Sequence, residues 1–387
     1  MVNGPEPVRT EAVPDGEPAA ASGPAGELAA EQNGRSWLWW AERFALLALL
    51  VAVVVSFALA EPDFRTLANL RVVLATQATL IILALAALFP LIVGQFDLSV
   101  AAIMGTSSIV AAGVLSKNHA PLVVALIAGV ASGLVVGAFN GWLVTRVRVN
   151  SLIVTLGVAT ILPGLVDWYS NGLTIVSGIP QSLLDAASGK LLGLPKSILW
   201  AIPVIVIIWY VLTQTPWGRR LEAIGANQEA ARLVGVRNDR LVLTSFVVSG
   251  GLSALAGILS LAQNGSADPQ TSLGSLLLPA LAAVFLGATA FRPGHYNVPG
   301  TVVAVFFVAF AVSGLTLAGA APWVNQVFNG AALIIAVTLS TLAAAGGGRP
   351  ASRALRSALR ARARQQSAAP APVNASTAAS QIREDRQ

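Results

Sequence analysis

One carboxylate stands where this chain changes from apolar to polar character. Asp97 lies in the stretch VGQFDLSVA, which directly follows a long apolar run. A carboxylate near hydrocarbon is costly and by default indicates function, such as contact with a ligand. Because Leu98 and Ser99 follow it, the same carboxylate could instead cap the next helix through backbone N–H groups. The sequence leaves both interpretations of Asp97 open.

Neutral hydrogen-bonding groups lie within or near the other apolar runs. Such groups suit an uncharged ligand rich in hydroxyl groups, although hydrogen bonds between helices explain most Ser and Thr residues in membranes. With Asp97 they form the candidate lining of a path through the molecule. The candidates are Gly94, Ser99, Asn140, Thr155 and Asn264.

Several kinds of chemistry are excluded or disfavoured. The chain has no cysteine, and its two histidines, His119 and His295, fall in short connecting loops, so we expect no metal and no cofactor. No series of intramembrane charges could carry protons or Na⁺, and no His/Asp/Glu cluster indicates an intramembrane enzyme. There is no phosphate-binding loop of the GxxxxGKS or GxxxxGKT type, so any nucleotide must bind to another protein.

Composition indicates a protein that crosses the membrane many times. Hydrophobic residues make up 55% of the 387 positions and charged residues only 11%, and the apolar runs repeatedly exceed the roughly 18 residues that span a bilayer. We therefore predict an all-α integral membrane protein with about ten spans. The expected spans are 41–60, 71–93, 98–115, 120–144, 150–168, 197–213, 241–262, 276–291, 298–317 and 323–343.

Lysine and arginine predict the orientation, because cytoplasmic loops carry an excess of both. With the N-terminus inside, most of the 24 basic residues fall on the cytoplasmic side, so both termini are expected there. The net charge of +6 follows this topology and does not indicate nucleic acid. We expect a disordered cytoplasmic tail over 1–36, a transmembrane domain over 37–345 and a basic, low-complexity cytoplasmic tail over 346–387, which could lie against membrane lipid.

The polar segment 215–239 lies between two apolar runs and contains a short, capped helix. Asn227 is a good N-cap, Glu229 suits the first turn, and Gly235 could end the helix in the C′ position. The residues of this helix that could dock into another protein are Ala230, Ala231, Arg232, Leu233 and Val234. An ordinary cytoplasmic loop with arginines for orientation is the alternative.

Four stretches resemble the permease subunit of ABC importers of the ribose/xylose (monosaccharide) type. They are GQFDLSV (94–100), NGWLVTRVRVNSLIVTLG (140–157), GRRLEAIGANQEAARLVGV (218–236) and PWVNQVFNGAALIIAV (322–337). The third is the most specific, since it is similar to the family's cytoplasmic segment that inserts into the ATP-binding subunit. The chain departs from the family at Gln95 and Phe96, and over GATAFRPGHYNVPG (287–300).

The resemblance implies a permease in the inner or plasma membrane that performs no bond chemistry. A separate ATPase, a sugar-binding protein outside the membrane and a second permease copy are the partners it implies, with a monosaccharide, possibly a pentose, as substrate. The alternatives are an ion-coupled secondary transporter, disfavoured by the missing charges, and a multi-span membrane transferase, disfavoured by the missing catalytic cluster.

Overall fold

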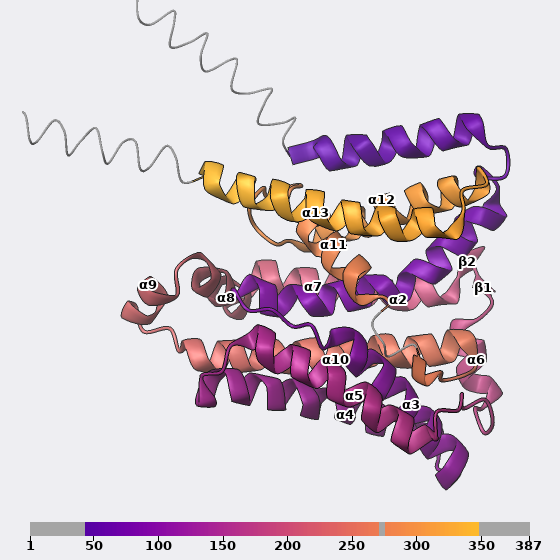
Figure 1. Cartoon of the computed structure of the whole chain (residues 1–387), viewed down its shortest axis with the longest axis horizontal. Coiled ribbons are helices and arrows are strands. Elements are labelled where there is room, and N and C mark those ends of the chain that lie inside the picture. The colour runs from indigo at the N-terminus through magenta and orange to yellow at the C-terminus, as the bar shows by residue number, and fades with distance from the viewer. Residues whose placement is uncertain (1–42, 271–274, 348–387) are drawn as a thin grey trace, which may run out of the picture. The chain divides into compact units, whose positions relative to one another are not determined.

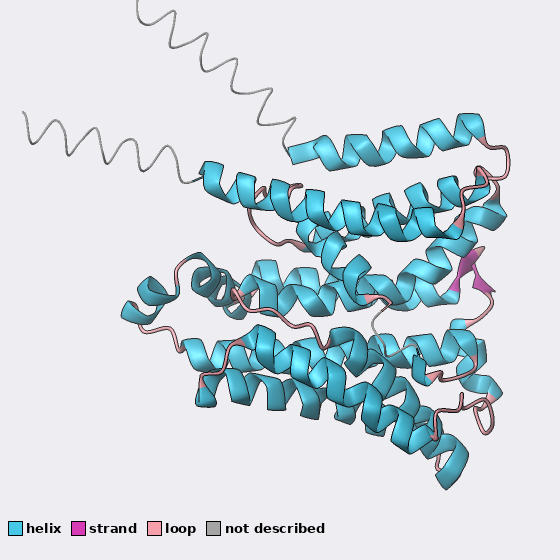
Figure 2. Ribbon diagram, in the orientation of Figure 1, coloured by secondary structure: helices cyan, strands magenta, loops and turns pink. Residues whose placement is uncertain are grey.

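The computed structural model describes residues 43–270 and 275–347. The expected tails, 1–36 and nearly all of 346–387, lie outside the described residues. Within the described residues, nine helices are long and apolar enough to cross a membrane, and Figure 2 shows how fully helices dominate. The prediction of an all-α, multi-pass membrane protein is therefore confirmed.

The long helices follow the predicted spans closely. The first helix is Arg43–Ala60, and α4 continues as a π-helical turn, Leu143–Val147. The others, labelled in Figure 1, are α2 Leu67–Ile92, α3 Val100–Asn118, α4 Leu122–Trp142, α5 Ser151–Ser170, α7 Lys196–Gln214, α10 Asn238–Asn264, α12 Val298–Leu317 and α13 Pro322–Gly347.

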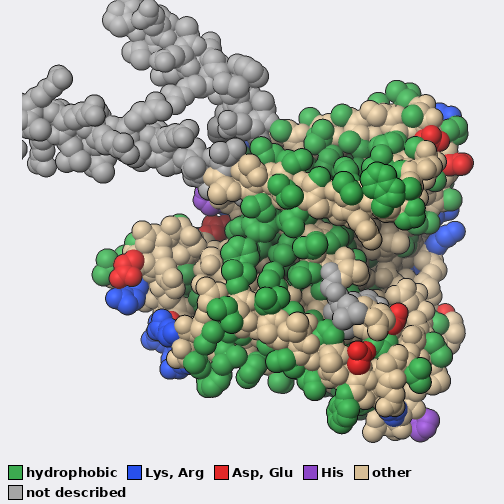
Figure 3. Space-filling view, viewed as in Figure 1, with side chains coloured by type: hydrophobic (Ala, Val, Ile, Leu, Met, Phe, Trp, Pro, Cys, Tyr) green, Lys and Arg blue, Asp and Glu red, His purple; other side chains and the backbone are tan. Residues whose placement is uncertain are grey.

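Short elements connect them at both ends of the long helices. They are α6 Gln181–Ala187, α8 Pro216–Ala226, α9 Gln228–Leu233, α11 Leu277–Gly287, and the antiparallel hairpin of β1 Lys190–Leu191 and β2 Leu194–Pro195. In the view of Figure 3, apolar side chains cover most of the middle of the molecule, while charged side chains gather mainly toward its left and right ends. This distribution is expected of helices that cross a bilayer.

The prediction of a full span over 276–291 is wrong. α11 has 11 residues, which rise about 16 Å, whereas the hydrocarbon layer is about 30 Å thick. The chain then turns through 288–297 before α12 begins. All of α11 from Ala280 onward is buried, and burial in protein is the condition under which broken helices are tolerated at membrane depth. Continuous apolar composition concealed this break.

The core is built around α2, which packs against α3, α7, α10, α11 and α12. Every residue from Ala78 to Ile92 is buried, so α2 is apolar on all sides, as expected of a central helix. α10 packs closely against α4 through glycine: a Cβ on Gly133 would lie 2.4 Å from the carbonyl oxygen of Gly250. Small residues on α4 thus let the two helix backbones approach closely, which is a common way for membrane helices to pack.

α10 connects two opposite sides of the molecule. It begins beside α9, where Asn238 Nδ2 donates to the carbonyl oxygen of Gln228 at 2.8 Å. It ends beside α6, where the isolated bridge between Ile175 and Ala267 ties the chain after α10 to the chain after α5. We call these two sides the α9 side and the α6 side; Figure 1 shows them at opposite ends of the long helices.

Candidate functional site

The junction between α2 and α3 is a stretch of non-helical backbone deep in the protein. α2 stops two residues before Gly94, whose φ of +75° suits glycine. The chain then runs without regular structure until α3 begins at Val100. Asp97 within this stretch is only 1% exposed, so its carboxylate must find its partners inside the protein.

The Asp97 carboxylate is fully engaged by hydroxyl and amide donors. Its Oδ1 accepts from the backbone N–H of Ser99 at 3.0 Å and from Ser99 Oγ at 2.6 Å. Its Oδ2 accepts from Ser249 Oγ of α10 at 3.0 Å. Asn140 Nδ2 of α4 donates to Ser99 Oγ at 2.9 Å. The carboxylate therefore holds the non-helical chain just before α3, whereas the N-cap residue of the helix itself is Ser99.

α5 holds the same junction from another direction. Thr155 Oγ1 accepts from the backbone N–H of Leu98 at 3.1 Å, and Ser151 Oγ accepts from that of Phe96 at 3.2 Å. Both hydroxyls satisfy buried N–H groups that no helix supplies with a partner. Of the six path candidates, five thus meet at one place, which we call the Asp97 junction: Gly94, Asp97, Ser99, Asn140 and Thr155.

Asn264, the sixth candidate, lies about 22 Å farther along α10 than Ser249. It lines a cavity of about 370 Å³ between α3 and α10 on the α6 side. The remaining lining residues of this α6-side cavity are Met104, Gly105, Ser108, Ser260, Ser266 and Asp268. The lining is mostly hydroxyl, amide and carboxylate.

A second cavity, of about 230 Å³, lies on the α9 side between the end of α2, α8 and the turn 288–297. Aromatic rings stand along it: Phe96 packs near Phe285 at 6.3 Å between centroids, and Phe285 meets the Tyr296 ring edge-on at 5.9 Å. Burial raises the pKa of Tyr296 to about 12. The other residues that line this second cavity, the α9-side cavity, are Leu91, Ile92, Gly94, Glu222, Gly225, Ala226, Gly294 and His295.

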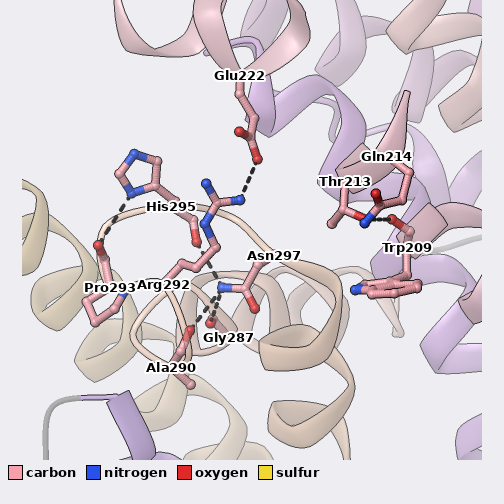
Figure 4. Close-up of polar contacts among 10 residues, drawn as sticks. All are labelled: Trp209, Thr213, Gln214, Glu222, Gly287, Ala290, Arg292, Pro293, His295 and Asn297. Carbon is pink, nitrogen blue, oxygen red and sulfur yellow. Dashed lines mark hydrogen bonds and ion pairs between the residues drawn. The ribbon is translucent and has the colours of Figure 1, made fainter. Parts of the chain in front are cut away.

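The turn 288–297 has a fixed conformation. Asn297 caps α12 by accepting from the N–H of Gly300, and its Nδ2 donates to the carbonyl oxygens of Gly287 and Ala290. From this turn Arg292 reaches α8, where its Nη1 lies 2.9 Å from Glu222 Oε1 (Figure 4). Sequence reasoning missed this ion pair, although Arg292 is the single arginine, with no lysine, in the divergent stretch 287–300.

The segment 215–239 contains two helices rather than one. Asn227 ends α8 and caps α9, its Oδ1 accepting from the N–H of Ala230 at 2.9 Å. Gly235, with φ of +84°, follows the end of α9. The predicted cap and stop are confirmed. Glu229 and Arg232 pair across one turn at 3.4 Å and are both well exposed.

The predicted docking face of α9 needs one correction. Ala231 is 4% exposed and belongs to the protein's own core, because α9 rests on this side. Leu233 and Val234, in contrast, are 82% and 79% exposed. The outward apolar surface of α9 is therefore carried by Leu233 and Val234, with Ala230 beside them, and not by Ala231.

α8 touches the end of α2 directly. A Cβ on Gly225 would lie 1.9 Å from the carbonyl oxygen of Ile92, so only glycine allows this approach. Two residues beyond Ile92 lies Gly94, where the Asp97 junction starts. α8 is therefore connected to the end of α2 by one close backbone contact, and to the turn 288–297 by the Glu222–Arg292 ion pair.

Comparisons with known proteins assign the chain to a family. Residues 68–337 match the family described as branched-chain amino acid transport system / permease component. The L-arabinose ABC transporter permease protein of Azospirillum brasilense is 30% identical over 86% of this chain and 94% of its own length. The ribose import permease protein of Bacillus subtilis is 33% identical over 76% of this chain and 90% of its own length.

A third relative is the D-allose transport system permease protein of Escherichia coli, 27% identical over 79% of this chain and 93% of its own length. No solved structure was found to match the chain. These relatives do not favour an ion-coupled transporter or a transferase. The chain therefore belongs to the branched-chain amino acid transport system / permease component family and is a multi-pass membrane permease of the ABC transporter type.

Proposed function

We propose that this chain is the membrane-spanning subunit of an ATP-driven importer and carries a neutral monosaccharide. A binding protein outside the cell delivers the sugar, and a separate ATPase supplies the energy, so the permease itself catalyses no bond chemistry. The observation that carries the ATPase partner is the capped helix α9, which presents Leu233 and Val234 to the outside of the subunit.

Two lines of support favour a sugar over a branched-chain amino acid. The relatives reported above transport arabinose, ribose and allose by name. An amino acid is a zwitterion, and its carboxylate needs a cationic partner when it leaves water. No lysine or arginine lines either of the two cavities in the described part of the chain. Hydroxyl and amide groups suit a neutral polyol better.

The proposed route of energy transfer starts at α9. An ATPase that binds Leu233 and Val234 moves α9 together with α8, because the single residue Asn227 connects the two helices. α8 then acts on the end of α2 at Ile92 and on the turn 288–297 through Glu222. The permease behaves as a two-state element whose populations are shifted by ATP and by the loaded binding protein.

Orientation and assembly belong to the same proposal. The α9 side faces the cytoplasm, since an ATPase must reach it, and both termini lie there. The first described helix begins on this side, where the N–H of Phe291 donates to the carbonyl oxygen of Arg43 at 2.9 Å. The exposed apolar helices contact lipid in the plasma membrane and a second permease copy, and the C-terminal basic tail lies near lipid headgroups.

Charge on the outward surface of α9 tests the proposal. Leu233→Glu is expected to abolish co-purification of the ATPase and ATP-driven sugar uptake, because it places a charge in an apolar contact while leaving the permease core untouched. Leu192→Glu is the matched control: Leu192 is 94% exposed on the hairpin of the α6 side. Unchanged co-purification with Leu233→Glu would overturn the assignment of α9.

A further inference from the structure

We propose that the α6-side cavity is the station in which the permease holds the sugar before it passes the Asp97 junction. This inference rests on the proposed function and adds the location and the residues. The cavity lies between α3 and α10 at the end of α10 that is farthest from α9. It is thus placed to receive a sugar released from a binding protein docked on the α6 side.

The lining of the cavity has the chemistry of a sugar site. Each sugar hydroxyl donates one hydrogen bond and accepts others, so a site needs mixed donors and acceptors in place of a full charge pair. Ser108, Ser260 and Ser266 supply hydroxyls, Asn264 supplies an amide, and Asp268 supplies a carboxylate. Met104 and Gly105 add an apolar wall for the C–H face of a pyranose or furanose ring.

Several of these polar groups are lightly engaged by the protein. Asn264 Nδ2 donates to Ser260 Oγ at 3.2 Å, a long bond that a sugar hydroxyl could replace. Asp268 Oδ1 accepts from the N–H of Gln270 at 2.9 Å, which fixes the carboxylate at the rim. Ser108 is nine-tenths buried, and no hydrogen bond to its hydroxyl occurs within the described residues. Its hydroxyl is available to a ligand.

The volume and the charge of the α6-side cavity narrow the class of ligand that it can hold. A volume of about 370 Å³ lies in the range of small-molecule sites, roughly 300–1,000 Å³. Among the described residues, Asp268 is the single charged residue of the lining. A carboxylate or phosphate on the ligand would be repelled by it and would find no cation there, so the cavity selects an uncharged polyol.

A polar face of α10 continues from the cavity toward the Asp97 junction. Ser253, Ser260 and Asn264 lie four, eleven and fifteen residues after Ser249, and at 3.6 residues per turn all four fall within about 60° of one another around the helix. Ser253 is fully buried, and its Oγ has no hydrogen-bond partner among the described residues. The polar face spans about 16 Å from Ser260 to Ser249, which gives the sugar a hydroxyl-lined route from the station to the junction.

The absence of cysteine from the chain allows a direct test. Ser108→Cys and Ser260→Cys, each made separately in the full chain and placed in lipid nanodiscs, are labelled with a membrane-impermeant thiol reagent. Labelling is repeated with D-ribose, L-arabinose or D-allose added at high concentration, and separately with L-leucine to test for binding of an amino acid. We expect at least one sugar to slow labelling at both positions by about threefold or more. L-leucine has no effect.

Ser177→Cys is the control, because Ser177 is exposed on the same side but does not line the cavity. Its labelling rate is expected to be the same with and without sugar. Failure of both Ser108→Cys and Ser260→Cys to react at all would contradict an open cavity. Equal slowing at Ser177 would show an effect of the solution and overturn the site.

Uptake by cells that carry the whole importer separates the two proposals. If the cells take up one of the three sugars but that sugar protects neither cysteine, the station is wrong and the proposed function stands. If they take up L-leucine and none of the sugars, or take up nothing offered, the proposed function is wrong. Sugar uptake together with protection at both positions supports both.

Discussion

The two cavities on either side of the Asp97 junction are lined by different kinds of residues. The α6-side cavity, about 370 Å³, is lined by serine, asparagine and aspartate from α3, α10 and the loop that follows. The α9-side cavity, about 230 Å³, is lined by rings, glycines and Glu222, which pairs with Arg292. The lining of the α6-side cavity offers hydrogen bonds to a ligand. In the α9-side cavity, the charge of Glu222 is already paired with Arg292.

This difference indicates a division of work. The hydroxyl and amide groups of the α6-side cavity suit the recognition of a ligand. On the α9 side, a partly exposed ion pair and close glycine contacts suit a closure that opens at a small cost in free energy. Exposed ion pairs contribute only about 0–1 kcal/mol, so a docked ATPase can break the Glu222–Arg292 pair. The bonds around Asp97 are buried and tie together three segments of the chain, and they are expected to survive the movement.

Removing the carboxylate that separates the two cavities has the largest expected effect. Asp97→Ala leaves the N–H of Ser99 and the hydroxyl of Ser249 buried without an acceptor. We expect the free energy of unfolding to fall by about 2–4 kcal/mol and transport to stop. Thermal unfolding in detergent measures the first and sugar uptake the second. Asp185→Ala, at an exposed position on the α6 side, is the control, and equal unfolding temperatures for both variants would refute the structural role of Asp97.

A side chain at Gly225 tests the contact by which α8 reaches the junction. Gly225→Val forces α8 away from the carbonyl oxygen of Ile92, and overpacking of this kind costs about 1–3 kcal/mol. ATP-driven uptake is expected to fall more steeply than stability, because the contact transmits motion. Gly164→Val is the control, since nothing lies within 4 Å of a Cβ there. Normal uptake by Gly225→Val would remove this contact from the route.

The closure on the α9 side is expected to depend weakly on its ion pair. In a double-mutant cycle with Glu222→Gln and Arg292→Gln, the coupling energy for unfolding should be about 0.2–1 kcal/mol. The exchange Glu222→Arg with Arg292→Glu should restore much of any lost uptake. A coupling energy of zero, together with unchanged uptake in each single variant, would show that the pair plays no part in closure.

The smallest expected effect is on the titration of Tyr296, which depends on whether water fills the α9-side cavity. Burial raises the pKa of Tyr296 from its ordinary value near 10 to about 12, so the folded state keeps this phenol protonated between those values while the unfolded state loses the proton. Tyr296 therefore contributes stability below pH 10 that is lost as the pH rises toward 12. In an absorbance titration, Tyr296→Phe should remove the latest-titrating component, and Tyr210→Phe should leave it. A titration of the wild type without a late component would mean that water fills this cavity.

The sequence predicted the helices well and their meeting points less well. Long apolar runs give spans directly, and Asn227 and Gly235 marked the limits of α9 because caps are local signals. The short length of α11 was not predicted, since hydropathy averages over a window and does not detect where a helix ends within apolar residues. Ala231 was misassigned because a six-residue helix carries too little periodicity to show which face is buried.

The two cavities could not be found from the sequence for a further reason. Ser108 and Ser260 lie on α3 and α10, far apart along the chain, and serine within a membrane helix more often bonds to the backbone. The Glu222–Arg292 pair joins α8 to the turn 288–297, and their approach depends on the path of α11. Such constellations depend on tertiary packing, whereas the path candidates around Asp97 were identified because several lie within short motifs.

ATP-driven uptake in a sealed system tests the central claim most directly. Proteoliposomes that contain the permease with its ATPase and binding protein are given labelled sugar outside and ATP on the side of the ATPase, while ionophores collapse the proton and sodium gradients. We expect accumulation that continues without the gradients and stops with Leu233→Glu. Accumulation that stops when the gradients collapse, with ATP still present, would contradict it.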